Sequence, residues 1–185
     1  LAAGEAFDLK FEGGKSLVDI RVTPATIKTL VDNGNAVRAP GGLIILSALA
    51  VDQIQGGVVN NSGALEAVGL VSHAGVIRLA ASGSITHTGT ITADAASGST
   101  GNGGTVTLIA SLSNPNSKTV VDGSLSARAG DLGGDGGFIE TSASQLQIGE
   151  ATRVTTLAPQ GNAGTWLLDP YDISISSGSG TGTTS

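Results

Sequence analysis

The sequence of 185 residues contains no cysteine, 3% aromatic residues and 13% charged residues, about half the charged fraction of roughly 25% in an average soluble domain. The lack of cysteine excludes disulfides, thiolate metal sites and thiol catalysis. Because aromatic side chains are so few, any core is built from Val, Ile, Leu and Ala. This composition favours many short strands around a thin core over one thick globular core.

Positive charge and long apolar runs are also scarce. The net charge of −6 argues against nucleic acid as a partner, because such binding needs a basic surface. No stretch of about 18 apolar residues is present, so we expect no membrane insertion. No signal peptide is visible at Leu1, and because the sequence opens without Met we interpret it as a fragment or a processed product.

Glycine, in contrast, is abundant: 29 of the 185 residues, more than twice the usual share of roughly 7%. Several glycines begin copies of one short apolar strand. The five copies are Gly42–Leu46, Gly75–Leu79, Gly104–Leu108, Gly137–Thr141 and Gly164–Leu168. The leading glycines are 33, 29, 33 and 27 residues apart, which is a real but irregular repeat.

A second strand series alternates with the first. Its copies are Ala36–Ala39, Ala64–Ala67, Thr90–Ala93, Ser124–Ala127 and the degenerate Val154–Leu157, and a weaker third strand shows in Ser84–Thr86 and Gln145–Ile148. Two or three short strands that recur about every 30 residues are typical of a β-solenoid. We therefore predict an all-β fold, a right-handed parallel β-helix of about five irregular turns. Glycine-rich segments at 94–103 and 129–136 are expected to be corner loops.

The two ends differ from the repeats. Thr23 resembles an N-cap, Pro24 a first helical position and Gly34 a C′ residue, so a short helix is predicted over Ala25–Asn33. We assign residues 1–34 to N-terminal strands and this helix, which packs on the first turn. Residues 35–175 form the β-helix, and residues 176–185, which are only Ser, Gly and Thr, form a flexible tail.

Three segments resemble the filamentous-haemagglutinin-like exoproteins of bacterial two-partner secretion. They are Val58–Ala67, Gly133–Ser142 and Ala163–Ile173, and the third is similar to a recurrent junction in the β-helical shaft of that family. The resemblance implies a secreted or surface-anchored adhesin outside the outer membrane, exported by an outer-membrane barrel transporter. It also implies attachment through a surface glycan, a matrix polysaccharide, or a receptor on host or bacterial cells, including in biofilms.

Few residues are candidates for chemistry. His73 and His87 lie 14 residues apart and lack a third ligand, so we interpret them as solvated corner residues. Asp131 and Asp135 resemble one damaged copy of a calcium-binding nonapeptide repeat, but that motif binds through tandem copies. We expect these carboxylates to be solvated at a corner, and we predict no metal site and no cofactor.

Asp169 and Asp172 are the pair that a polysaccharide-active β-helix enzyme, a hydrolase or a lyase, would use. Because Pro170 and Tyr171 intervene, we expect a turn in which Asp169 accepts local N–H groups. The sequence therefore predicts no catalytic residue and a structural, adhesive role, with the enzyme as the alternative. A third reading, ice binding, depends on the Thr90/Thr92 and Thr105/Thr107 pairs, which belong to different strand series.

The tryptophan and two neighbouring asparagines are expected to have structural roles. Trp166, the only tryptophan, is expected to pack in the core or at an end rather than to serve as a sugar-stacking platform. Asn60 and Asn61 are expected to take part in a ladder of side chains stacked along one corner.

Overall fold

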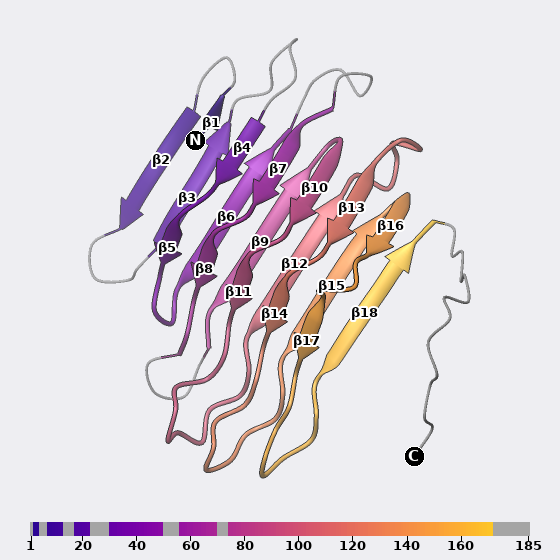
Figure 1. The fold of residues 1–185 in the computed structure, drawn as a ribbon. Helices are drawn as coiled ribbons and strands as arrows, with labels where there is room; N and C mark the ends of the chain where they lie inside the picture. Colours follow the sequence, from indigo (N-terminus) through magenta and orange to yellow (C-terminus); the bar gives the residue numbers. More distant parts are fainter. Residues whose placement is uncertain are drawn as a thin grey trace.

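The fold is a parallel β-solenoid of about five turns with three strands in each turn (Figure 1). The structure is a computed structural model that describes residues 2–3, 7–12, 17–22, 30–49, 56–69 and 74–171. These residues form eighteen strands and no helix. Among them, therefore, no helix has the length and hydropathy needed to cross a bilayer.

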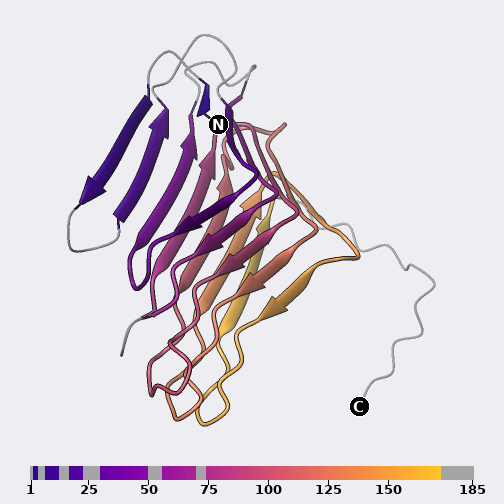
Figure 2. The same cartoon turned by 60° about the vertical axis from the view of Figure 1, so that its left-hand side comes forward.

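Each turn contributes one strand to each of three sheets, which form separate faces of the coil (Figure 2). The first face contains β4 (Leu30–Asn33), β7 (Val58–Asn61), β10 (Ser84–His87), β13 (Lys118–Val121) and β16 (Gln145–Ile148). The second contains β5 (Ala36–Arg38), β8 (Ala64–Glu66), β11 (Thr90–Thr92), β14 (Ser124–Ser126) and β17 (Arg153–Thr155). The third contains β6 (Leu43–Ala48), β9 (Val76–Ala81), β12 (Thr105–Ala110), β15 (Phe138–Ala143) and β18 (Thr165–Pro170).

Both predicted strand series are confirmed by the register of the sheets. Leu46 pairs with Leu79 and Leu79 with Leu108 on the third face, while Leu65, Ile91 and Leu125 align on the second. All six side chains are buried in one core. Because inward residues stack on like residues one turn away, apolar columns run along the solenoid axis and fill its interior.

The leading glycines of the first series are required by close contact between turns. A Cβ added to Gly104 would lie 2.2 Å from the carbonyl oxygen of Gly75, and one added to Gly137 would lie 2.0 Å from that of Gly104. Both separations are far below van der Waals contact, so a side chain at either position would push adjacent turns apart. The repeat of glycine is therefore a packing requirement of the coil.

The third strand series is more complete than its two visible copies suggested. Val31, Val59, Ile85 and Thr119 form one inward column on the first face, and all four are buried. The outward and corner residues of these strands vary from turn to turn, which is why the pattern is weak in the sequence.

The helix predicted over Ala25–Asn33 is wrong where the structure describes it. Leu30–Asn33 forms strand β4, which pairs in parallel with β7 and antiparallel with β1 (Ala2–Ala3); residues 25–29 lie outside the described residues. The local capping signals were overridden by pairing with Val58–Asn61, which offers a matching inward residue and a matching asparagine 28 positions away.

The glycine-rich excursions at 94–103 and 129–136 connect the second face to the third, as predicted, and project together at one corner (Figure 2). They also hydrogen-bond to each other. The N–H of Gly130 donates to the carbonyl of Gly101 (2.9 Å) and that of Leu132 to Ser99 (3.0 Å). The stacking between turns thus extends beyond the strands into the loops.

The two ends of the solenoid are built differently. At the N-terminal end, β3 (Leu17–Val22) pairs with β6, and β2 (Phe7–Glu12) then pairs antiparallel with β3. At the other end, β16, β17 and β18 are each the last strand of their sheet in the part of the chain that the structure describes. Inward side chains there are partly exposed, including Leu168 at 41% and Ile148 at 40%.

Candidate functional site

A ladder of polar side chains runs along the solenoid axis at the end of the first-face strands, beside the second face. The side-chain amide of Asn33 donates to Oδ1 of Asn61 (2.8 Å), and Nδ2 of Asn61 lies 3.0 Å from Nδ1 of His87. Nε2 of His87 lies 3.1 Å from the carbonyl oxygen of Ser124. A carbonyl only accepts, so Nε2 carries the proton and Nδ1 accepts from Asn61. The ladder predicted for Asn60 and Asn61 is confirmed for Asn61; Asn60 lies on the outward side of the same strand.

His87 is fully buried on β10, so its predicted position at a solvated corner is wrong. It occupies an inward position, above Asn61 and below Val121 in the register. Desolvation by burial lowers the pKa of His87 below its ordinary value of 6.5, and the carbonyl oxygens of Ser124 and Asn61 oppose this effect because they favour the protonated ring. The neutral imidazole is therefore a structural part of the core, and His73 lies outside the described residues.

Asp131 and Asp135 bind backbone N–H groups of neighbouring turns. Oδ2 of Asp131 accepts from the N–H of Gly98 (3.0 Å) and from the hydroxyl of Ser97 (3.0 Å), and these two bonds, Gly98 first, lower the pKa of the exposed Asp131 carboxyl. Oδ1 of Asp135 accepts from the N–H of Asn162 (2.8 Å). Within the described ranges, no group of three or more His, Asp or Glu side chains is placed to hold a metal ion.

Asp169 lies on the outer side of β18 and is exposed. The strand continues to Pro170, and Asp169 pairs with Ser142 of β15, so the turn predicted at Asp169 and Pro170 is wrong. Proline fits here because the N–H of Tyr171, not of residue 170, donates to the carbonyl of Ala143 (3.2 Å), so the missing N–H does not interrupt the ladder to β15. Asp172 lies outside the described residues.

Trp166 packs against the core, as predicted. It is half-buried on β18 in the inward column that contains Ile139. Its indole N–H donates to the hydroxyl of Thr141 (3.2 Å). The ring therefore covers the apolar interior at the last described turn, with its one polar group satisfied.

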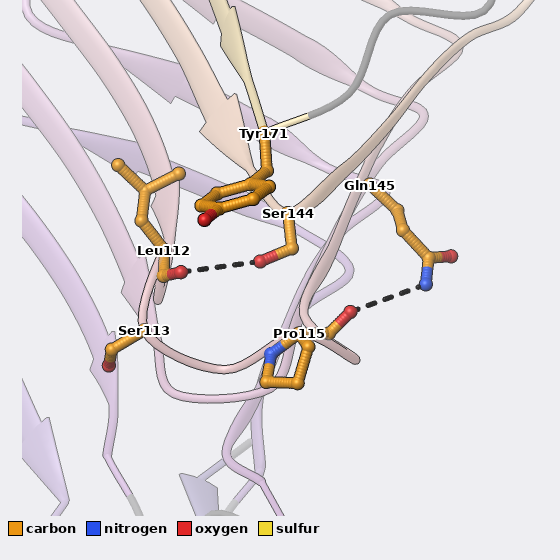
Figure 3. A pocket seen from close by; sticks show the side chains of 6 residues that line it. All are labelled: Leu112, Ser113, Pro115, Ser144, Gln145 and Tyr171. Atoms are coloured by element: carbon orange, nitrogen blue, oxygen red, sulfur yellow. Dashed lines mark hydrogen bonds between the residues drawn. The ribbon is translucent and has the colours of Figure 1, made fainter.

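The candidate binding site is a groove of about 510 Å³ at the corner between the third and first faces. It is lined by Leu112, Ser113, Pro115, Ser144, Gln145 and Tyr171 (Figure 3). Its volume lies within the range of roughly 300–1,000 Å³ typical of small-molecule sites. Tyr171 is 78% exposed and Leu112 is 42% exposed, and none of the six described lining residues carries a charge.

One wall of the groove is the connection 111–117, which is held by buried polar groups. Nδ2 of Asn114 donates to the carbonyl of Ser82 (2.9 Å), and the hydroxyl of Ser144 donates to the carbonyl of Asn114 (2.8 Å). The N–H of Ser144 donates to the hydroxyl of Ser117 (2.9 Å). These bonds tie the loop to the turns on both sides of it, so the groove is preorganised.

The groove is not among the sites predicted from the sequence. The signal is a difference in length. Residues 111–117 join β12 and β13, and residues 49–57 join β6 and β7, whereas β9 and β10 are joined by residues 82–83 and β15 and β16 by Ser144 alone. An insertion at one corner of a repeating coil leaves the core unchanged and is a common place for function.

The two Thr-x-Thr pairs lie on different faces, Thr90 and Thr92 on β11 and Thr105 and Thr107 on β12. They do not form the single flat array that ice binding requires. Comparisons with known proteins found no matching family model, no matching curated protein and no matching solved structure.

Proposed function

We propose that this chain is a structural and adhesive segment of a large secreted or surface-anchored bacterial adhesin, which mediates attachment to cells or to matrix. The observation that carries the proposal is the in-register stacking of five three-stranded turns among the described residues. At about 4.8 Å per turn, such a coil is a stiff rod that grows by adding turns.

The adhesive part of the proposal is supported by the resemblance of Val58–Ala67, Gly133–Ser142 and Ala163–Ile173 to exoproteins of two-partner secretion. Under this proposal an outer-membrane barrel transporter exports the protein, and the binding partner in adhesion is a surface glycan, a matrix polysaccharide or a cell receptor. A rod with many turns displays its faces far from the cell, so weak contacts add up through avidity.

The test is adhesion of beads coated with the 185-residue chain. We expect them to attach to at least one of three surfaces: bacterial cells, epithelial cells and biofilm polysaccharide. Beads coated with albumin at equal density are the control. Attachment equal to albumin on all three surfaces would overturn the adhesive role.

The alternative is a polysaccharide-active β-helix enzyme, and one observation favours it. Glu140 and Asp169 lie on adjacent strands of the same outer face, since Glu140 pairs with Leu167 and Asp169 with Ser142. Incubation with a panel of polysaccharides, followed by measurement of reducing ends and unsaturated products, separates the two functions. Turnover that is abolished by Asp169→Asn would favour the enzyme and overturn the adhesin proposal.

A further inference from the structure

The groove at 111–117 combines an exposed aromatic ring with uncharged polar groups. In Figure 3 the Tyr171 ring lies beside Leu112 and Ser144, while the amide of Gln145 extends toward Pro115 on the other side. The apolar surface is thus supplied by Tyr171, Leu112 and Pro115, and the available hydrogen-bonding groups by Gln145 and Ser113, since the hydroxyl of Ser144 donates to the carbonyl of Asn114.

From this arrangement we propose that the groove binds a neutral oligosaccharide, with one sugar ring stacked on Tyr171. The inference rests on the proposed adhesive function and names the ligand class and the site. A pyranose ring has an apolar face of C–H groups and a rim of hydroxyls. The aromatic face of Tyr171 fits the first, and groups that both donate and accept fit the second.

Gln145 and Ser113 are the residues that recognise the hydroxyl rim. The amide of Gln145 is held only by a long contact of its Nε2 with the carbonyl of Pro115 (3.5 Å), so a ligand hydroxyl displaces it at little cost. The hydroxyl of Ser113 lies 2.9 Å from that of Ser111; one of the two donates, and Ser113 keeps capacity for a further bond.

The described part of the lining favours a neutral ligand over a charged one. None of its six residues is charged, so an ionic group there would lose hydration without a partner in the lining itself; Lys118 pairs with Gln145 on the adjoining strand, and an anionic oligosaccharide is therefore tested as a competing ligand. A proline-rich peptide docks in grooves lined by several aromatic rings, whereas Tyr171 is the only ring among the described lining residues. A neutral sugar needs one ring and uncharged polar groups, which is what the groove presents.

The experiment is a titration of the 185-residue chain with maltotetraose, cellotetraose, N,N′-diacetylchitobiose and N-acetyllactosamine, followed by NMR. Because the chain has a single tyrosine, the ring signals of Tyr171 are unambiguous. We expect at least one of the four sugars to shift these signals and to receive saturation transfer from the protein. A proline-rich peptide and a heparin-derived oligosaccharide are tested in parallel.

Three variants make the test specific to the groove. Tyr171→Ala is expected to raise Kd about tenfold, equivalent to about 1.4 kcal/mol, whereas Tyr171→Phe keeps the ring and changes Kd by about twofold or less. Leu132→Ala, an exposed leucine in a different corner loop, is the matched control and leaves Kd unchanged.

The outcomes separate this proposal from the proposed function. The groove proposal is overturned if none of the four sugars shifts the Tyr171 signals, or if the peptide or the anionic oligosaccharide does so instead. It is equally overturned if a sugar binds Tyr171→Ala as tightly as the original chain. In each of these cases coated beads that still attach to a surface leave the adhesive function standing, with its ligand bound elsewhere.

Discussion

Replacing Asn61 with alanine removes the central member of the buried ladder between Asn33 and His87. Asn61 is 1% exposed and makes two side-chain hydrogen bonds, of 2.8 Å from Asn33 and 3.0 Å to His87. No buried side-chain nitrogen or oxygen among the described residues lacks a partner. The substitution therefore creates an unsatisfied group where every other one is satisfied.

The magnitude follows from the position of each partner. Nδ1 of His87 is left without a donor in a fully buried site, which costs about 1–3 kcal/mol. Asn33 is only half-buried, so water replaces its lost bond at small cost. With the loss of packing around the missing amide, we expect Asn61→Ala to lower the free energy of unfolding by about 2–4 kcal/mol.

Asn60→Ala is the matched control, since Asn60 is the adjacent residue on β7 and is half-buried on the outward side. We expect it to change the free energy of unfolding by about 0.5 kcal/mol or less. The assay is urea unfolding followed by circular dichroism at neutral pH, with the m-value checked for constancy.

A double variant tests the mechanism itself. His87→Leu removes the group that Asn61→Ala leaves unsatisfied, so the two substitutions together should cost at least about 1 kcal/mol less than the sum of the single effects. The ladder does not stabilise the fold if Asn61→Ala is no more destabilising than Asn60→Ala. The same conclusion follows if the changes in free energy of unfolding caused by Asn61→Ala and His87→Leu simply add.

Three further predictions concern other parts of the coil. Burial lowers the pKa of His87 in the folded chain, so as pH falls the histidine of the unfolded chain is protonated before that of the folded chain. The urea midpoint should therefore fall as pH drops below about 6.5, and His87→Leu should flatten this dependence. Gly104→Ala, with a Cβ at 2.2 Å from the Gly75 carbonyl, should lower the thermal midpoint strongly or abolish folding. Gly34→Ala, whose Cβ would meet only the Ser62 hydroxyl at 3.8 Å, should leave the midpoint nearly unchanged, and equal midpoints for the two variants would contradict the packing argument. Val31→Asp buries an unpaired charge at a 2% exposed site and should lower the free energy of unfolding in urea by more than about 3 kcal/mol. Leu30→Asp should lower it by less, and the reverse order of the two effects would argue for a helix there.

Much of the architecture could be predicted from the sequence because the coil repeats its own pattern. Leu46, Leu79 and Leu108 occupy the same place in successive copies, and stacking of like on like buries all of them. The leading glycines could be recognised for the same reason, although the carbonyl contact that requires them at Gly104 is visible only in the structure.

The tertiary structure decided the features that depend on a partner about 30 residues away. Leu30–Asn33 has the local signals of a helix end, and only pairing with β7 makes it a strand. His87 is polar and follows a threonine, and only the positions of Asn61 one turn earlier and of the Ser124 carbonyl give it hydrogen bonds inside the core.

The groove illustrates the same division between local pattern and tertiary contact. The long connection at 111–117 is apparent in the spacing of the strands. The hydrogen bonds that hold it in place, from Asn114 to Ser82 on one side and from Ser144 to Asn114 on the other, are visible only in the structure. Tyr171 reaches it from the last described turn. The sequence by itself determined the period and the inward columns, because these follow from local alternation repeated along the chain. The structure decided which residues meet at a corner, because that depends on how the turns stack.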